Sequence, residues 1–204
     1  MRLGYRLIKR TFDLCASVAA LITLSPLFLI LAAAIKLEDP RGKVFYKQPR
    51  FGINISQFEI YKFRSMFSNA EELFEQMTPE QKQEWETNFK VKDDPRITRV
   101  GDFIRKTSLD ELPQLLNIIK GEMSIVGPRP PLVAEEKAYG EHLAKVMSVR
   151  PGLTGYWQAY GRNDISFEDR IKMNLYYIQN MSVAMDLRII GKTISSVIKK
   201  EGAI

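Results

Sequence analysis

An uncharged apolar run from Leu14 to Ile35, LCASVAALITLSPLFLILAAAI, sets the first limit on how this chain folds. As a straight helix rising about 1.5 Å per residue, the run would reach about 33 Å, enough to cross the hydrocarbon core of a bilayer. No other run in the sequence approaches that length. The chain therefore divides into a membrane segment, residues 1–38, and a domain, residues 39–204, that lies in water or at the membrane surface.

Three arrangements of the apolar run compete. A cleaved signal peptide fits the basic start and the alanines at 32–34, but the run is longer than an ordinary signal core and Asp13 interrupts its entry. A single-pass anchor is the default for this length, yet cations flank both ends, and both groups favour the cytoplasmic side. These flanking cations are Arg2, Arg6, Lys9, Arg10, Lys36, Arg41, Lys43 and Lys47.

The third arrangement is a re-entrant hairpin that breaks at Ser25-Pro26, in the middle of the run. Pro26 removes a backbone donor and clashes with the preceding turn, so it breaks or kinks a helix there. The serine hydroxyl can bond to backbone groups freed by the break. Two arms of about ten residues each could then dip into the bilayer and return to the same face. The residues alone leave the re-entrant and spanning arrangements equally open.

The charge balance indicates an anionic partner. The 204 residues carry a formal net charge of +6, and the pI is about 9.3. This fits a phosphate-bearing substrate, an acidic membrane face or nucleic acid. The cations are spread among acids, without a basic aromatic face, so no nucleic acid is expected as a partner. The single cysteine, Cys15, excludes an internal disulfide, and its apolar surroundings predict a buried thiol.

Local patterns predict an α+β fold that is mostly helical. Residues 43–47 and 53–63 are rich in β-branched and aromatic residues on either side of QPRFG, which predicts a small β-hairpin. Residues 70–88 predict a polar helix pair interrupted at Thr78-Pro79. Near the C-terminus, Leu187, Ile190 and Ile194 share one stripe of a helix. Such a stripe is typical of an interfacial amphipathic helix and equally of a surface helix packed on a core.

Two adjacent carboxylates, Asp110 and Glu111, open an apolar helix in SLDELPQLLNIIKGEMSIVGPRP (108–130). Helix capping is the simpler interpretation, because Ser108 and Glu111 have the spacing of a capping box. Pro113 favours a helix that begins near residues 108–110, since proline is tolerated chiefly in the first turn. The alternative is that these carboxylates also take part in chemistry.

Cations that could bind phosphate lie near the carboxylates in sequence or on the predicted hairpin: Lys62, Arg64, Arg105, Arg129 and Arg150. Guanidinium groups match phosphate oxygens in pairs. The simpler alternative for Lys62 and Arg64 is that they only end a strand at the protein surface, without binding phosphate. A diphosphate beside Asp110 and Glu111 would need Mg²⁺ to bridge the like charges. Aspartate can also attack phosphorus itself, so the residues predict phosphoryl chemistry at a membrane surface.

Four segments carry a resemblance to a known family: KFRSM (62–66), the 108–130 motif, RPGLTGYWQAYGR (150–162) and DLRII (186–190). In this order, after a basic and apolar start with Ser-Pro, the sequence resembles the bacterial sugar transferases. These are monotopic phosphoglycosyl transferases that use polyprenyl phosphate. The resemblance covers nearly the whole chain and is closest to the small members, or to the catalytic domain of the larger ones.

The resemblance implies transfer of a hexose 1-phosphate from a UDP-sugar to undecaprenyl phosphate, with Mg²⁺ and release of UMP. It implies that Asp110 is the nucleophile carrying a covalent sugar phosphate, that Glu111 assists, and that both are metal ligands. By the same match, Lys62, Arg105 and Arg129 are active-site cations, and Arg150 begins the RPG loop.

The resemblance also implies a setting for this reaction. The membrane helix would be re-entrant, broken at Ser25-Pro26, with the catalytic domain on the cytoplasmic face of the bacterial inner membrane. The reaction would begin assembly of an exopolysaccharide, capsule, O-antigen or glycoprotein glycan. The sugar, galactose, glucose or an N-acetylated sugar, is open. So are a homodimer and contact with downstream glycosyltransferases.

Overall fold

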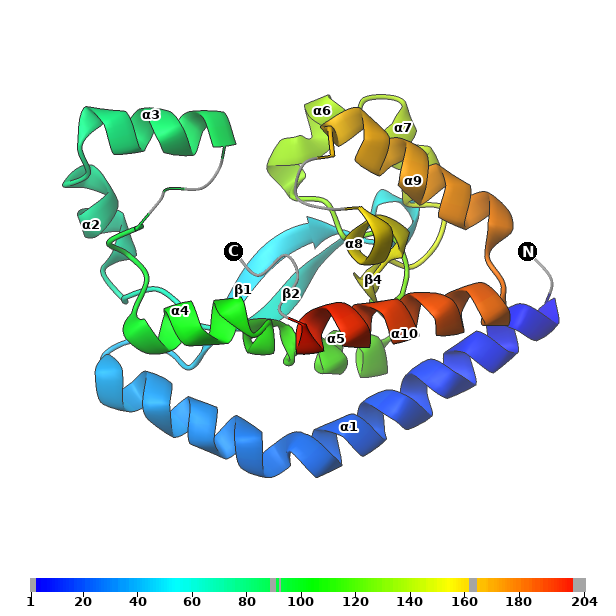
Figure 1. The fold of residues 1–204 in the computed structure, drawn as a ribbon, viewed down its shortest axis with the longest axis horizontal. Coiled ribbons are helices and arrows are strands. Elements are labelled where there is room, and N and C mark those ends of the chain that lie inside the picture. The colour runs from blue at the N-terminus through cyan, green and yellow to red at the C-terminus, as the bar shows by residue number, and fades with distance from the viewer. Residues whose placement is uncertain (1–2, 89–90, 92, 162–164, 200–204) are drawn as a thin grey trace.

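The computed structural model describes residues 3–88, 91, 93–161 and 165–199, with the backbone alone for 86–88 and 197–198. The described chain is mostly helical and contains two small sheets (Figure 1). A long helix, α1, runs beneath the remaining elements, and the last helix, α10, lies between it and the body of the domain in this view. The predicted α+β class, rich in helix, is confirmed.

Helix α1 spans Leu3–Glu38 without interruption and contains Pro26. Figure 1 shows that it bends near its middle into two arms. Ser25 Oγ donates a hydrogen bond to Ile22 O at 2.8 Å, one turn earlier in the helix. A proline inside a helix removes a backbone donor and kinks it, which accounts for a bend here. The predicted helix-break-helix is therefore a bend within one helix and not an interruption.

The first arm of α1 is fastened to the last helices of the chain. Asp186, in α10 (Val183–Ile198), accepts hydrogen bonds from Lys9 Nζ and Tyr5 Oη, both at 2.9 Å. Its other oxygen accepts a bond from Tyr177 Oη at 2.8 Å, from α9 (Phe167–Asn180). Asp13, buried in α1, accepts the Ile125 backbone amide at 3.0 Å. These long-range polar bonds fix where the first arm lies.

The second arm is fastened to the same domain by other residues. Leu31 and Ile35 pack with Phe63 and Ile104 in one apolar cluster. Glu38, at the end of α1, accepts hydrogen bonds from the first amides of α4 (Arg99–Lys106) at 2.7 and 2.9 Å. A carboxylate at a helix N-terminus is favourable because it meets unpaired amides. Both ends of α1 therefore lie against one body.

The outward surface of α1 is apolar and exposed. In its most apolar stretch, 11% of the residues are buried inside the protein, and α1 is the one described helix long and apolar enough to cross a membrane by length and composition. Cys15, predicted to be buried, is exposed on this helix. The largest exposed apolar side chains of α1 are Leu3, Leu7, Ile8, Phe12, Val18, Ile22, Leu29, Ile30 and Leu37. This surface resembles one that meets lipid.

The hairpin consists of β1 (Phe45–Phe51) and β2 (Gln57–Phe63), which pair antiparallel. Its prediction is confirmed, but the turn lies later than expected. QPRFG belongs largely to β1, and the chain reverses at residues 53–55, where Asn54 and Ile55 have positive φ angles of 56° and 61°. The register places Lys62 opposite Tyr46, near the end of β2.

A second, parallel pair was not predicted from the sequence: β3 (Ser124–Val126) and β4 (Gly152–Thr154). A Cβ on Gly152 would lie 2.1 Å from Gly127 N, so only glycine permits this approach. The pair brings the loop after β3, which carries Arg129, beside the RPG loop.

The polar helix pair is confirmed as α2 (Ala70–Glu75) and α3 (Pro79–Asn88). Residues 133–146 form a short 3-10 turn (Val133–Glu135), α6 (Glu136–Tyr139) and α7 (His142–Val146). Gly140, with a φ of 49°, separates the two helices. The segment after the RPG loop contains β4 and α8 (Tyr156–Tyr160).

Asp39, directly after α1, is a stability determinant of the fold. Its carboxylate accepts Ser68 N and Arg64 Nη1, each at 2.6 Å. The Ser68 amide is the main reason why the pKa of Asp39 is lowered to about 2, and Arg64 adds to it. Because the pKa is lower in the folded state, this stabilisation is complete above the unfolded value near 4. It is lost as the pH falls through about 2.

Asp39→Asn is therefore expected to lower the midpoint of thermal unfolding at pH 7 by about 2–8 °C, because it removes charge-assisted hydrogen bonds. The loss of stability between pH 4 and pH 2 should also become shallower. Scanning calorimetry in detergent across this pH range measures both effects. The exposed Glu75, changed to Gln, is the control, and an equal effect of the two changes would contradict this role.

Candidate active site

Asp110 and Glu111 lie in a short 3-10 turn, Leu109–Glu111, between α4 and α5 (Gln114–Lys120). The predicted capping box is wrong. Ser108 has a positive φ of 56° and caps no amide, and helix α5 begins only after Pro113. The side chain of Glu111 points instead at cations from other parts of the chain. The two carboxylates therefore do not cap helix α5 and are available to bind cations in a site.

Lys62, from β2, joins the two carboxylates. Its Nζ lies 2.8 Å from Glu111 Oε1 and 3.6 Å from Asp110 Oδ2. The three side chains are 18%, 24% and 12% exposed respectively, so water screens these charges only partly. The β1–β2 hairpin therefore places the Lys62 ammonium group next to both adjacent carboxylates.

The same surroundings move the pKa values of the two acids in opposite directions. Burial raises the pKa of Asp110, and the charge of Glu111 adds to this, although Lys62 and Arg105 oppose it. Burial acts in the same direction on Glu111, but Lys62 and Arg129 outweigh it and lower the pKa of Glu111 to about 2. Glu111 is therefore the more firmly ionised of the two.

Two of the predicted arginines also reach the dyad. Arg129 Nη1 lies 3.8 Å from Glu111 Oε1. Arg105, from α4, donates through Nε to Ser65 Oγ at 2.8 Å, and burial lowers its pKa while Asp110 opposes that shift. Asp110 therefore has a guanidinium within electrostatic reach as well as an ammonium.

The structure does not bring the other two predicted cations to the dyad. Arg64 lies beyond the end of β2, and its guanidinium bonds to the Asp39 carboxylate and to Asp39 O at 2.8 Å. Arg150 is exposed, and its Nε donates to Gly121 O at 2.9 Å, at the end of α5. Each of these cations lies closer to another acceptor than to the dyad: Arg64 to Asp39, and Arg150 to Gly121 O.

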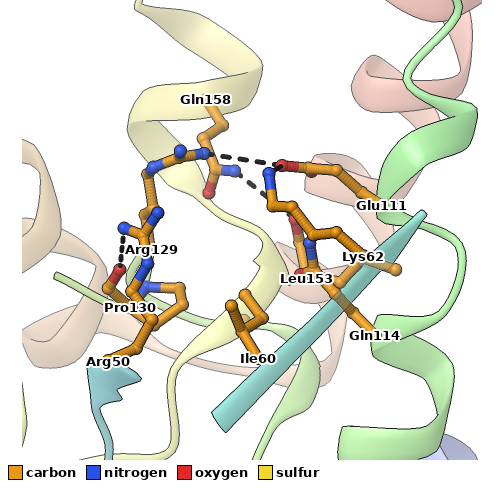
Figure 2. A pocket seen from close by; sticks show the side chains of 10 residues that line it. Arg50, Ile60, Lys62, Glu111, Gln114, Arg129, Pro130, Leu153 and Gln158 are labelled. Atoms are coloured by element: carbon orange, nitrogen blue, oxygen red, sulfur yellow. Dashed lines mark hydrogen bonds and ion pairs between the residues drawn. The ribbon is translucent and has the colours of Figure 1, made fainter. Parts of the chain in front are cut away.

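A small pocket, which we call the rear pocket, lies behind Glu111. Its volume is about 10 Å³ and its lining residues are Arg50, Ile60, Lys62, Glu111, Gln114, Arg129, Pro130, Gly152, Leu153 and Gln158. Figure 2 shows Arg129 and Gln158 on one side of it and Lys62 and Glu111 on the other. Arg50, Gln114 and Gln158 were not predicted as site residues. No local pattern marks them, because β1, α5 and α8 meet only in the folded chain.

The donor set fits a magnesium ion shared with a substrate. Mg²⁺ is commonly bound by one or two carboxylates together with phosphate oxygens. Asp110 and Glu111 supply that number, and among the described residues no group of three or more His, Cys, Asp or Glu side chains forms a fuller cage. Glu111 is already bound closely by Lys62, so Asp110 is the carboxylate with more capacity for a further cation.

Taken together, the site contains two carboxylates and four cations: Lys62, Arg50, Arg105 and Arg129. The excess positive charge suits a phosphate-bearing ligand, and the buried Asp110 carboxylate is an oxygen nucleophile within that field. The arrangement is capable of phosphoryl chemistry.

Comparison with known proteins agrees with this chemistry. The sequence model of the family described as bacterial sugar transferase matches residues 4–200. The exopolysaccharide production protein ExoY of Sinorhizobium fredii is 46% identical over 198 residues, which cover 96% of this chain and 87% of that protein.

Two longer relatives carry more specific names. The undecaprenyl-phosphate galactose phosphotransferase of Salmonella typhimurium is 43% identical over 201 residues, covering 97% of this chain and 42% of that protein. The undecaprenyl-phosphate glucose phosphotransferase of Komagataeibacter xylinus is 42% identical over 198 residues, covering 91% and 35%. The chain thus spans less than half the length of these two relatives. The family match over residues 4–200 includes the hairpin, the dyad and both loops of the site, and the chain belongs to the bacterial sugar transferase family.

Proposed function

We propose that this transferase moves a hexose 1-phosphate from a UDP-sugar to undecaprenyl phosphate and releases UMP. The observation that carries the proposal is the buried Asp110 carboxylate, held beside Glu111 and Lys62 in a cation-rich site. The names of the galactose and glucose phosphotransferases support the substrate class and favour those two sugars. The name of the ExoY relative supports a role in exopolysaccharide production.

In the first displacement, an Oδ atom of Asp110 forms a bond to the sugar-proximal phosphorus. The bond from that phosphorus to the bridging oxygen breaks, and UMP leaves with the electron pair. Lys62 and Arg105 offset the negative charge that develops on the transferring group. The sugar 1-phosphate stays on Asp110 as an acyl phosphate.

In the second displacement, a phosphate oxygen of undecaprenyl phosphate forms a bond to the same phosphorus. The bond to Asp110 Oδ breaks, which restores the carboxylate and yields the lipid diphosphate sugar. A group with a pKa of about 2, as Glu111 has, is a weak base near neutral pH. We therefore assign Glu111 to holding Lys62, Arg129 and the metal in place. When bound at Asp110 and Glu111, Mg²⁺ would neutralise charge on the substrate's phosphate oxygens.

We further propose that the chain enters one leaflet of the bacterial inner membrane from the cytoplasmic face. Three features support this: both ends of α1 lie against one domain, its outward surface is apolar, and Leu187 and Ile194 of α10 are about half exposed. A bent helix whose ends meet one body returns to the face that it entered. That face is where a UDP-sugar and the lipid phosphate would meet.

This topology predicts that both ends of α1 are reached from the same side. Arg6→Cys and Lys43→Cys, each in a Cys15→Ser background, replace an exposed residue near the start of α1 and one five residues after its end. Both variants should react with a membrane-impermeant maleimide in inverted vesicles, and neither should react in intact spheroplasts. Reaction of one variant from each side would show a spanning helix instead.

Product analysis tests the reaction itself. The protein, Mg²⁺ and undecaprenyl phosphate are incubated with UDP-galactose, UDP-glucose or UDP-N-acetylhexosamines, and the nucleotide released is identified. UMP is expected with at least one sugar. Release of UDP would indicate an ordinary glycosyltransferase, which leaves the phosphate behind. Absence of turnover together with strongly salt-dependent DNA binding would indicate a membrane-tethered scaffold.

A further inference from the structure

Arg50 is a buried cation that forms no direct ion pair among the described residues, although the more distant charges of Glu135 and Glu111 favour its ionised form. Its side chain is 5% exposed, and it donates to two neutral acceptors: Pro130 O at 3.0 Å and Gln48 Oε1 at 2.8 Å. Among the described residues its Nε has no hydrogen-bond partner. Burial of a guanidinium without a bound anion is unfavourable. An anion from outside the chain would complete this arrangement.

The rear pocket offers two more buried polar atoms without a partner among the described residues. Gln114, in α5, is 2% exposed and its Nε2 donates to nothing; Gln158 Oε1, from α8, accepts from nothing. Together with Arg50 Nε, the rear pocket therefore has, within the described chain, two free donors, Arg50 Nε and Gln114 Nε2, and one free acceptor, Gln158 Oε1. Its volume is enough for about one oxygen atom of a ligand. A phosphate monoester, whose second pKa is about 6, is mostly a dianion near neutral pH and supplies acceptor oxygens for the two donors.

Charge and position indicate which phosphate this is. Lys62, Arg129 and Glu111 also line the rear pocket, and Lys62 is the residue that reaches Asp110. A phosphate with one oxygen in the pocket would therefore adjoin the phosphorus that Asp110 attacks. Figure 2 shows Arg50 and Arg129 along the same wall of the pocket, suited to hold neighbouring oxygens of one group.

We propose that Arg50 and Gln114, with Arg129, form one subsite for both phosphate monoesters of the reaction: the UMP that leaves and the undecaprenyl phosphate that attacks. The inference rests on the proposed function. In each displacement the entering and leaving oxygens are roughly in line across phosphorus. Asp110 occupies one end of that line in both steps, so the other end receives UMP first and the lipid phosphate second. UMP must leave before the lipid enters.

Single-turnover discharge of the labelled enzyme tests this subsite. Wild-type protein is charged from a UDP-sugar with ³²P in its sugar-proximal phosphate and freed of nucleotide. It is then discharged with UMP, which reforms the UDP-sugar, or with undecaprenyl phosphate. Arg50→Met should raise the half-saturating concentration of both acceptors about 10- to 100-fold, the loss expected for a charge-assisted hydrogen bond. The exposed Lys47, also in β1 and changed to Met, should leave both unchanged.

A second variant separates binding from loop packing. Gln114→Met removes a pocket donor but keeps the bonds from Arg50 to Pro130 and Gln48. It should raise both half-saturating concentrations about 2- to 10-fold. A rise for only one acceptor, or a change only in the maximal rates, would overturn the shared subsite while the charged enzyme still forms. Failure of wild-type protein to take up label would instead refute the proposed function, and the subsite with it.

Discussion

Changing Asp110 to Asn is expected to abolish covalent labelling and to reduce sugar phosphate transfer by at least about 10³-fold. The amide keeps the size of the carboxylate but lacks its nucleophilic oxygen, so no acyl phosphate forms. The measurement is retention of ³²P on denatured protein after incubation with a UDP-sugar labelled in its sugar-proximal phosphate. Wild-type protein should retain label without any lipid acceptor.

Two controls define this result. Asp102→Asn changes an exposed acid of α4 that pairs with Lys106 on the surface, and it should label as wild type does. Glu111→Gln should still acquire label, because the nucleophile is intact, but should turn over slowly. Equal labelling of the Asp110 variant and wild type would remove Asp110 as the nucleophile.

The second large effect is expected for Lys62→Met. Its ammonium group lies between the two acids, so its loss leaves Asp110 and Glu111 as adjacent, mostly buried carboxylates. Charge stabilisation of the transferring phosphoryl group is lost as well, and we expect transfer to fall about 10²- to 10³-fold. The rate of label uptake by the enzyme measures this directly.

Lys120→Met is the matched control for Lys62→Met, since Lys120 is an exposed lysine that bonds to the neighbouring strand residue Tyr61. Circular dichroism separates a fold defect from a chemical one. If folded Lys62→Met labelled at the rate of wild type, the ammonium would have no part in the first displacement.

Elements with strong local signals were predictable from the sequence. The hairpin follows from the β-branched and aromatic residues on either side of QPRFG, and the polar helix pair from Thr78-Pro79. The bend in α1 follows from Ser25-Pro26. The parallel pair β3–β4 was not predictable, because three residues carry too little pattern and its close approach depends on Gly127 and Gly152 meeting across the fold.

The candidate site likewise contains residues that the sequence predicted and residues that it did not. Asp110, Glu111 and Lys62 were predicted together and lie together. Arg64 was expected beside them, but Asp39 is a nearer carboxylate. The capping box failed because Ser108 adopts a left-handed conformation, which local spacing does not reveal. Arg50 lacked any local signal, since its importance comes from burial.

The bond between Lys9 and Asp186 joins positions 177 residues apart. A ribosome therefore adds a further 177 residues after Lys9 before its partner Asp186 has been made. Until then, α10 cannot restrain the first arm of α1, and the final position of that arm depends on the synthesis of α10. The first arm of α1 should therefore reach its final place in the membrane and in the enzyme only after α10 has been made and bound to it.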